Sequence, residues 1–121
     1  MPEEGAERKR RKKEIKALTR RAGALVDQAH GEEKGGAARK KLLQRASDLF
    51  DQAIAVGPVD GFKFDARLHN NAGVVLVRRE NPGDALRHYQ RALALYPGYE
   101  SALGNAAEAR AMLHAMHRGE L

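Results

Sequence analysis

One spaced pattern of alanine, aromatic and proline residues occurs twice in the chain and constrains its fold more than any other feature. The first copy consists of Ala46, Phe50, Ala53 and Pro58. The second copy consists of Ala85, Tyr89, Ala92 and Pro97. In both copies the successive residues are 4, 3 and 5 positions apart. Two copies of one unit indicate a fold that is built by stacking similar elements.

The spacing of the pattern is that of a helix. Steps of 4 and 3 place the first three residues of each copy on one helical face. The alanines let a partner helix come close, and the aromatic ring fills the space beside them. The proline stands just past the helix end, because it cannot continue the backbone hydrogen bonds. Each copy therefore predicts a helix that packs against another helix.

A second duplicated motif lies on the other helix of the unit. Asn71-Ala72-Gly73 recurs as Asn105-Ala106-Ala107, 34 residues later. Residues 66–99 resemble a tetratricopeptide repeat (TPR), whose period is 34 residues. The likeness rests on Gly73 and on the second copy of the alanine, aromatic and proline pattern. His69 stands where the family has a tryptophan.

The resemblance implies an all-α fold, with antiparallel helix hairpins stacked as a short right-handed superhelix of about five helices. We expect a flexible N-terminus over 1–6 and a single TPR-like domain over 7–121. Within that domain we expect a distorted repeat with extended helices at 7–56, an inserted loop at 57–65, a regular repeat at 66–97 and a capping helix at 98–118. The first hairpin should be overlong at its Gly31–Gly36 turn, and Asn81-Pro82 should begin a helix.

The composition limits the chemistry that the chain can perform. It has no cysteine, and therefore no disulfide framework and no thiolate metal site. No apolar run approaches the roughly 20 residues that span a bilayer, and the N-terminal residues lack the apolar stretch that is typical of a secretory signal. We expect a cytoplasmic protein, or a nuclear one in a eukaryote. The glycine spacing at 31–36 is that of a phosphate loop, but Ala37-Ala38 stand where that motif needs lysine and serine or threonine.

The histidines and hydroxyl side chains do not suggest catalysis. His114 and His117 are three residues apart and are expected to be exposed near a helix end, although a metal pair is the alternative. His69 and His88 are expected on the surface without a partner. With two serines and one threonine, no nucleophile, cofactor site or metal site is predicted, and we expect no enzyme activity.

The TPR resemblance also implies a binding groove, because the first helix of each TPR unit lines a concave face that holds a partner peptide or helix. Carried over to this chain, the groove residues are Arg67, Asn70, Asn71, Val74, Val77, Arg78, Ser101, Asn105, Glu108 and Met112. For Asn71, hydrogen bonding between repeats is an equal alternative. Two aromatic residues of the inserted loop, Phe62 and Phe64, are expected to pack over the helix edges or to form a docking hook.

Positive charge gathers at the N-terminus. Residues 1–21 have a net charge of +5, whereas the whole chain has +6. One interpretation is a solvated, charged helix start. Clustered like charges weaken a helix, however, and this favours an anionic counterpart, for which the candidates are an acidic protein, nucleic acid or an anionic membrane surface. The residues of this patch are Arg8, Lys9, Arg10, Arg11, Lys12, Lys13, Lys16, Arg20 and Arg21.

Three functions are consistent with this sequence. The first is a non-catalytic adaptor or scaffold that binds a partner peptide or helix in the groove. The second is a nucleic-acid-associated factor that uses the basic N-terminal helix. The third is a structural module that self-assembles as a homo-oligomer through the open ends of the stack.

Overall fold

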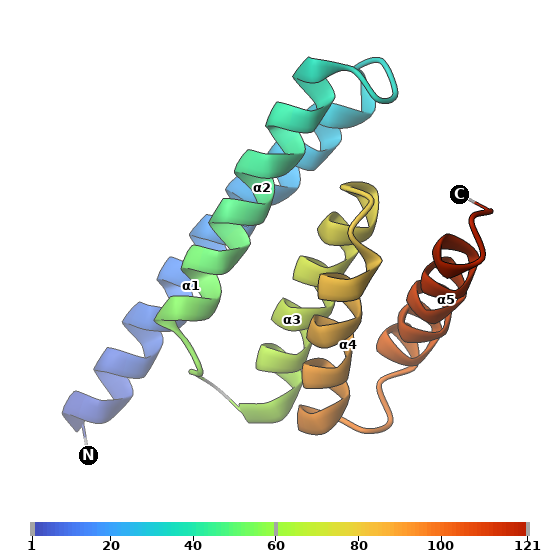
Figure 1. Cartoon of the computed structure of the whole chain (residues 1–121). Coiled ribbons are helices and arrows are strands. Elements are labelled where there is room, and N and C mark those ends of the chain that lie inside the picture. Colours follow the sequence, from blue (N-terminus) through green and yellow to red (C-terminus); the bar gives the residue numbers. More distant parts are fainter. Residues whose placement is uncertain (1, 60, 121) are drawn as a thin grey trace.

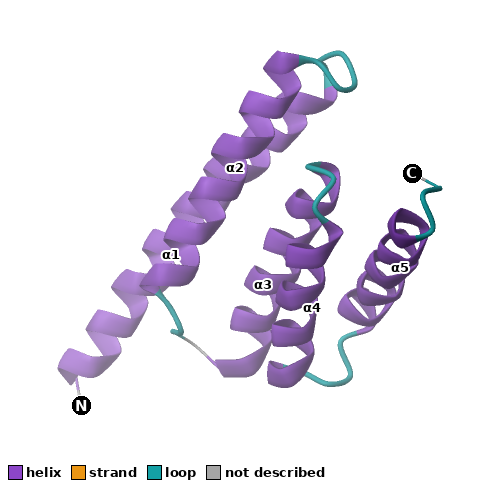
Figure 2. Cartoon of the chain, in the orientation of Figure 1, coloured by secondary structure: helices purple, strands orange, loops and turns teal. Residues whose placement is uncertain are grey.

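Helices joined by turns and short loops make up the residues that the computed structural model describes, which are 2–59 and 61–120. No strand occurs within these ranges (Figure 2). The helices are α1 (Pro2–His30), α2 (Ala37–Val56), α3 (Gly61–Arg78), α4 (Pro82–Leu95) and α5 (Glu100–His117). The expected all-α class is confirmed.

The helices are stacked as antiparallel hairpins (Figure 1). Helix α1 packs against α2, and α3 packs against α4. The contact between α2 and α3 joins the two hairpins, while α5 covers the free side of the second hairpin through contacts with α4 and α3. The N- and C-termini lie at opposite ends of the stack (Figure 1). This arrangement is the TPR-like stack of hairpins that the sequence predicts.

The duplicated pattern forms the interior of both hairpins. Its four alanines have 0% exposure, and the two aromatic residues, Phe50 and Tyr89, have 5% and 1%. Alanine at a helix contact allows the backbones to come close, and the buried ring supplies most of the apolar area at that level of the stack. The two copies therefore have the same structural role.

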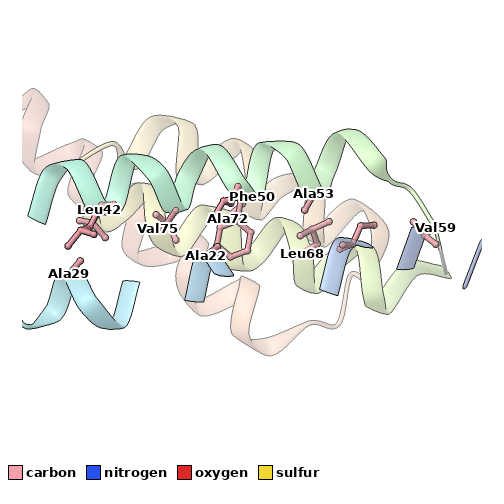
Figure 3. Packing of buried hydrophobic residues seen from close by; sticks show 13 residues of the cluster. Ala22, Ala29, Leu42, Phe50, Ala53, Val59, Leu68, Ala72 and Val75 are labelled. Atoms are coloured by element: carbon pink, nitrogen blue, oxygen red, sulfur yellow. The ribbon is translucent and has the colours of Figure 1, made fainter. Parts of the chain in front are cut away.

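The apolar core continues from the first hairpin into the second. One cluster combines Ile15 and Ala22 of α1 with Phe50 of α2 and with Leu68 and Val75 of α3 (Figure 3). A second cluster joins Leu76, Tyr89 and Ala106, and so connects α3, α4 and α5. Because α3 belongs to both clusters, it is the helix that holds the two ends of the stack together.

Two helices begin earlier than the sequence predicts. Residues 2–6 belong to α1, whereas we expected a flexible segment over 1–6; Met1 lies outside the described residues. Proline is tolerated in the first turn of a helix, and Glu7 forms ion pairs with Arg10 and Arg11 one turn further on. These pairs favour the continuous helix.

The connection between the hairpins is shorter than the predicted loop at 57–65, because α3 begins at Gly61. Asp65 explains the difference: its buried carboxylate accepts a hydrogen bond from the backbone N–H of Val59 at 3.3 Å, and this bond ties the connection back onto the helix. The turn between α3 and α4 agrees with the sequence, since Asn81 caps α4 by accepting from the N–H of Asp84, and Pro82 follows it.

The first hairpin is longer than the second. Helices α1 and α2 have 29 and 20 residues, whereas α3 and α4 have 18 and 14. The extra length extends past the turn between α3 and α4 (Figure 1). The end of the first hairpin therefore forms a wall beside that turn.

Candidate partner-binding groove

A groove lies between α1 and α3, with α2 beneath it. Its volume is about 510 Å³. Phe50 of α2 and Val75 of α3 form a buried apolar floor. Exposed Lys16 and Arg20 of α1 line one side, and exposed Asn71 of α3 lines the other. An apolar floor with a polar rim can bury a side chain of a partner while hydrogen bonds fix its orientation.

Local sequence explains why α1 presents these side chains together. Lys16, Arg20 and Gly23 follow each other at steps of 4 and 3, which places them on one helical face. Beyond the local backbone of α1, no described atom lies within 4 Å of the position that a Cβ would take at Gly23. The missing side chain therefore leaves room in the groove. From the sequence, Lys16 and Arg20 were assigned to the basic patch and no residue of α1 was assigned to the groove. The pair Ala22-Gly23, which resembles Ala72-Gly73 of α3, was a usable signal.

The predicted groove residues of α3 separate into two groups. Asn71 and Val74 line the groove. Arg67 and Arg78 are exposed on the same helix but do not line this cavity, and Val77 packs against the cluster formed with α4 and α5.

Asn70 is buried, with 3% exposure, and joins α3 to α5. Its side-chain N–H group donates to the hydroxyl of Ser101 at 3.1 Å and to that of Tyr99 at 3.5 Å. Its carbonyl oxygen accepts from Asn105 at 3.0 Å. The hydrogen bonding between repeats that we considered for Asn71 is therefore made by its neighbour, and Asn70 is not accessible to a partner.

The predicted groove residues of α5 have different surroundings. Ser101 and Asn105 belong to the hydrogen-bond network of Asn70. Glu108 is exposed and Met112 is half-buried.

Glu108 also acts on Tyr89 of α4. Burial, and secondly the negative charge of Glu108, raise the pKa of Tyr89 to about 12, so this phenol remains neutral.

The predicted basic patch is divided by the fold. Arg8, Lys9, Arg10 and Lys13 are exposed on α1 ahead of its first buried apolar residue, Ile15. Arg21 is also exposed, on the following part of the helix, and Lys16 and Arg20 line the groove.

The remaining two residues of the patch contact the connection between the hairpins. Arg11 donates to the backbone carbonyl of Pro58 at 3.5 Å, and the ammonium nitrogen of Lys12 lies 5.1 Å from the centre of the Phe64 ring. Both side chains are half-buried. They hold α1 against the rest of the stack, so they differ in role from the exposed part of the patch.

His69 and His88 form a pair, which corrects the expectation that each lies on the surface without a partner. Their Nδ1 atoms are 3.2 Å apart, and their rings are stacked with centres 5.5 Å apart. Burial lowers the pKa of His69 to about 4, with further contributions from the charges of His88 and Arg91. Burial also lowers the pKa of His88, while Asp51 and Asp84 oppose that shift. The fold brings these residues together from helices that the sequence separates.

The two phenylalanines of the connection have different environments. Phe64 is half-buried and packs against the core of the first hairpin. Phe62 is 51% exposed and makes an edge-to-face contact with Tyr96, which in turn stacks on Tyr99. Packing over the helix edges is therefore confirmed for Phe64, whereas most of Phe62 remains accessible.

The structure shows no metal cluster in the part of the chain that it describes. Within residues 2–59 and 61–120, no three metal-ligating side chains lie close enough to hold an ion together. His114 and His117 are both exposed on α5. Among the same described residues, no helix has the length and apolar character required to cross a membrane.

Comparison with known families identifies the second hairpin. The family model of the tetratricopeptide repeat matches residues 66–99. The chain carries a TPR unit. This unit begins inside α3, contains all of α4 and ends at Tyr99, and it spans the residues over which the sequence resembles the family. The TPR is a protein-interaction unit, and that general role is the function that the match supports. No curated protein and no solved structure gives a significant match to the chain.

Proposed function

We propose that this TPR protein is a non-catalytic adaptor that holds a peptide or helix of a partner protein in the groove between α1 and α3. The observation that supports the proposal is the groove itself. Exposed polar residues of α1 and α3, the first helices of the two hairpins, surround an apolar floor. The second hairpin carries the family match, and the first hairpin supplies the opposite wall.

The chemistry of the rim favours binding over catalysis. Lys16, Arg20 and Asn71 offer hydrogen-bond donors, and Asp27 offers an acceptor. Thr19 is the single hydroxyl residue at this groove, and its oxygen donates to the backbone carbonyl of Lys16 at 3.1 Å. Asp27, the carboxylate of the groove lining, lies eight residues further along α1, about 12 Å from Thr19, so it is too distant to activate the hydroxyl as a nucleophile.

The experiment is affinity capture from a nuclease-treated lysate with a pair of matched double variants. Lys16→Glu with Asn71→Glu changes the two walls of the groove at exposed positions. Lys41→Glu with Gln90→Glu makes the same change in charge at exposed positions on α2 and α4 that do not line the groove. We expect the first variant to lose the captured partner and the second to retain it. Equal capture by both variants would contradict the proposal.

A second candidate function is association with nucleic acid through the first part of α1. It is supported by the exposure of Arg8, Lys9, Arg10 and Lys13 before the first buried apolar residue of the helix. Such contacts would be to phosphates, so affinity should fall steeply between low and physiological salt. Substituting Arg8, Lys9 and Lys13 with glutamine should then abolish the binding of a fluorescent oligonucleotide. Retained binding would exclude this function.

A further inference from the structure

A second cavity lies where the long first hairpin passes the turn between α3 and α4. Its volume is about 400 Å³. The walls come from the loop between α1 and α2, from the first half of α2 and from the last residue of α3 with the turn that follows. Because the overhang of the first hairpin makes this cavity, it is separate from the groove between α1 and α3. Figure 1 shows the overhang beside the turn.

The lining of the cavity is strongly cationic. Five of the nine lining residues are basic: Lys34, Arg39, Lys40, Arg78 and Arg79. Glu80 is the one acidic residue in this lining. Leu43 is buried at the inner wall, and Gln44 accepts a hydrogen bond from Arg79, which links α2 to the turn. The net charge of the lining is therefore about four positive charges in a volume suited to a small ligand.

These cations have no anionic partner among the described residues. The ion pairs that those residues form involve Arg10, Arg11, Arg87 and Arg118, and none includes a basic residue of the cavity. Like charges that face one cavity repel each other, and the walls of a cleft concentrate their field. An anion that enters the cavity would relieve this repulsion.

We propose that the cavity binds a linear polyphosphate group of two or three phosphates. Three guanidinium groups can each meet phosphate oxygens through paired N–H donors, and the two ammonium groups add point charges. A single carboxylate would neutralise one of about four charges, whereas a triphosphate neutralises most of them. No aromatic residue lines the cavity, so a nucleobase would have no ring on which to stack. The cavity should therefore recognise the phosphates of a ligand and not its base.

This site does not depend on the phosphate-loop spacing at Gly31–Gly36, in which the required lysine and hydroxyl are missing. Its cations come from side chains of two hairpins that are more than thirty residues apart in sequence. It also goes beyond the proposed adaptor function, because it uses a different surface and a ligand of different chemistry.

The test is isothermal titration calorimetry of the full chain at physiological salt with two probes, sodium tripolyphosphate and ATP. Arg39→Gln with Lys40→Gln removes two cations of the cavity. Lys41→Gln with Arg45→Gln removes the same charge from exposed positions of α2 outside it. We expect the cavity variant to weaken binding of tripolyphosphate at least about tenfold, since hydrogen bonds between charged groups are roughly twice as strong as those between neutral groups. The control should change it less than about threefold.

A third variant gives an effect of opposite sign. Glu80→Gln removes the acidic group of the lining, so it should tighten binding of tripolyphosphate about twofold or more. Similar affinities for tripolyphosphate and ATP would support the proposal, because the triphosphate is the group that the two probes share. Three results would overturn the proposal: no binding of tripolyphosphate by the wild-type chain, equal weakening by the cavity and control variants, or binding of ATP alone.

Discussion

At the scale of single residues, Gly73 is the described glycine at which an added side chain would meet the closest neighbour, the ring of Tyr89. A Cβ at Gly73 would lie 2.4 Å from Cε1 of the Tyr89 ring, and this ring is 1% exposed. The ring is held by both helices of the second hairpin, so it cannot move aside without loss of packing. The small residue is therefore required by contact between α3 and α4.

Gly73→Ala should destabilise the protein by about 1–3 kcal/mol, because the added methyl group overpacks the hairpin. Urea unfolding measures this change. Gly104→Ala is the matched control, since beyond the local backbone of α5 no described atom lies within 4 Å of the added group, and alanine there should stabilise the helix by roughly 0.5–1 kcal/mol. If the free energy of unfolding changed in the same direction in both variants, contact with Tyr89 would not be the reason for the glycine at position 73.

The pair His69 and His88 should make stability depend on pH. The pKa of His69 in the folded chain is about 4, below its ordinary value of 6.5. Between these values the unfolded chain binds the proton more readily, so stability should decrease as the pH falls from about 6.5 to about 4. Below about pH 4, His69 is protonated in both the folded and the unfolded chain and causes no further loss of stability.

Thermal unfolding over this pH range measures the dependence. His69→Gln should flatten it, because the variant has no proton to bind at that position. His117→Gln, at an exposed position on α5, should leave the dependence as it is in the wild type. An unchanged slope in His69→Gln would show that other groups cause the acid sensitivity.

At the scale of elements, the end of α3 is held by backbone hydrogen bonds and contains a residue with positive φ. Asn81 donates its backbone N–H to Leu76, and Glu80 donates to Val77, which together satisfy the last carbonyl groups of the helix. Glu80 adopts a φ of 62°, a conformation that glycine adopts more easily. The turn therefore stores strain at the same residue that faces the cationic cavity.

Glu80→Gly should stabilise the protein by about 0.5–1 kcal/mol, because glycine removes the strain of the left-handed backbone. Gly35→Ala is the converse control: its φ is 78° and nothing lies within 4 Å of the added methyl group, so it should destabilise through the backbone alone. Chemical denaturation of the two variants would show opposite shifts. A loss of stability in Glu80→Gly would contradict this account of the turn.

At the scale of the whole molecule, α3 couples the stability of the two hairpins, because it packs in the core clusters of both. Stacked repeats contact only their neighbours, so each interface can open from the end of the stack. At the C-terminal end, α5 contributes Ala102, Ala106 and Ala109 as its buried residues. The hydrogen bonds of Asn70 add the polar connection between α3 and α5.

Asn70→Ala should loosen α5 while the first hairpin stays intact. Removal of this buried amide should cost about 1–3 kcal/mol, and the loss should be local to the last interface. Hydrogen exchange measures it: amides of α5 should exchange faster, and those of α2 should not change. Asn71→Ala changes an exposed neighbour and should leave α5 protected. Equally fast exchange in all helices of Asn70→Ala would show that the stack opens as one unit.

The sequence by itself determined the helical class, the repeat and its inner face. The duplicated pattern identified Phe50 and Tyr89 as core residues, and the resemblance carried by Gly73 and the second copy of the pattern located the TPR unit at 66–99. These features are local, because helical periodicity and capping depend on residues a few positions apart. The same local signals failed at the beginning of two helices. Ion pairs of Glu7 favour the first turns of α1, and the hydrogen bond between Asp65 and Val59 holds the connection against the first turns of α3.

Tertiary structure alone decided which residues face each other across the hairpins. It buried Asn70 and left Asn71 exposed, paired His69 with His88, and placed cations of α2 beside the turn after α3. No sequence pattern sets these contacts, because they depend on how far one hairpin is displaced and rotated against the next. That displacement follows from the packing of whole helices, in which a change at one contact shifts every residue along the interface.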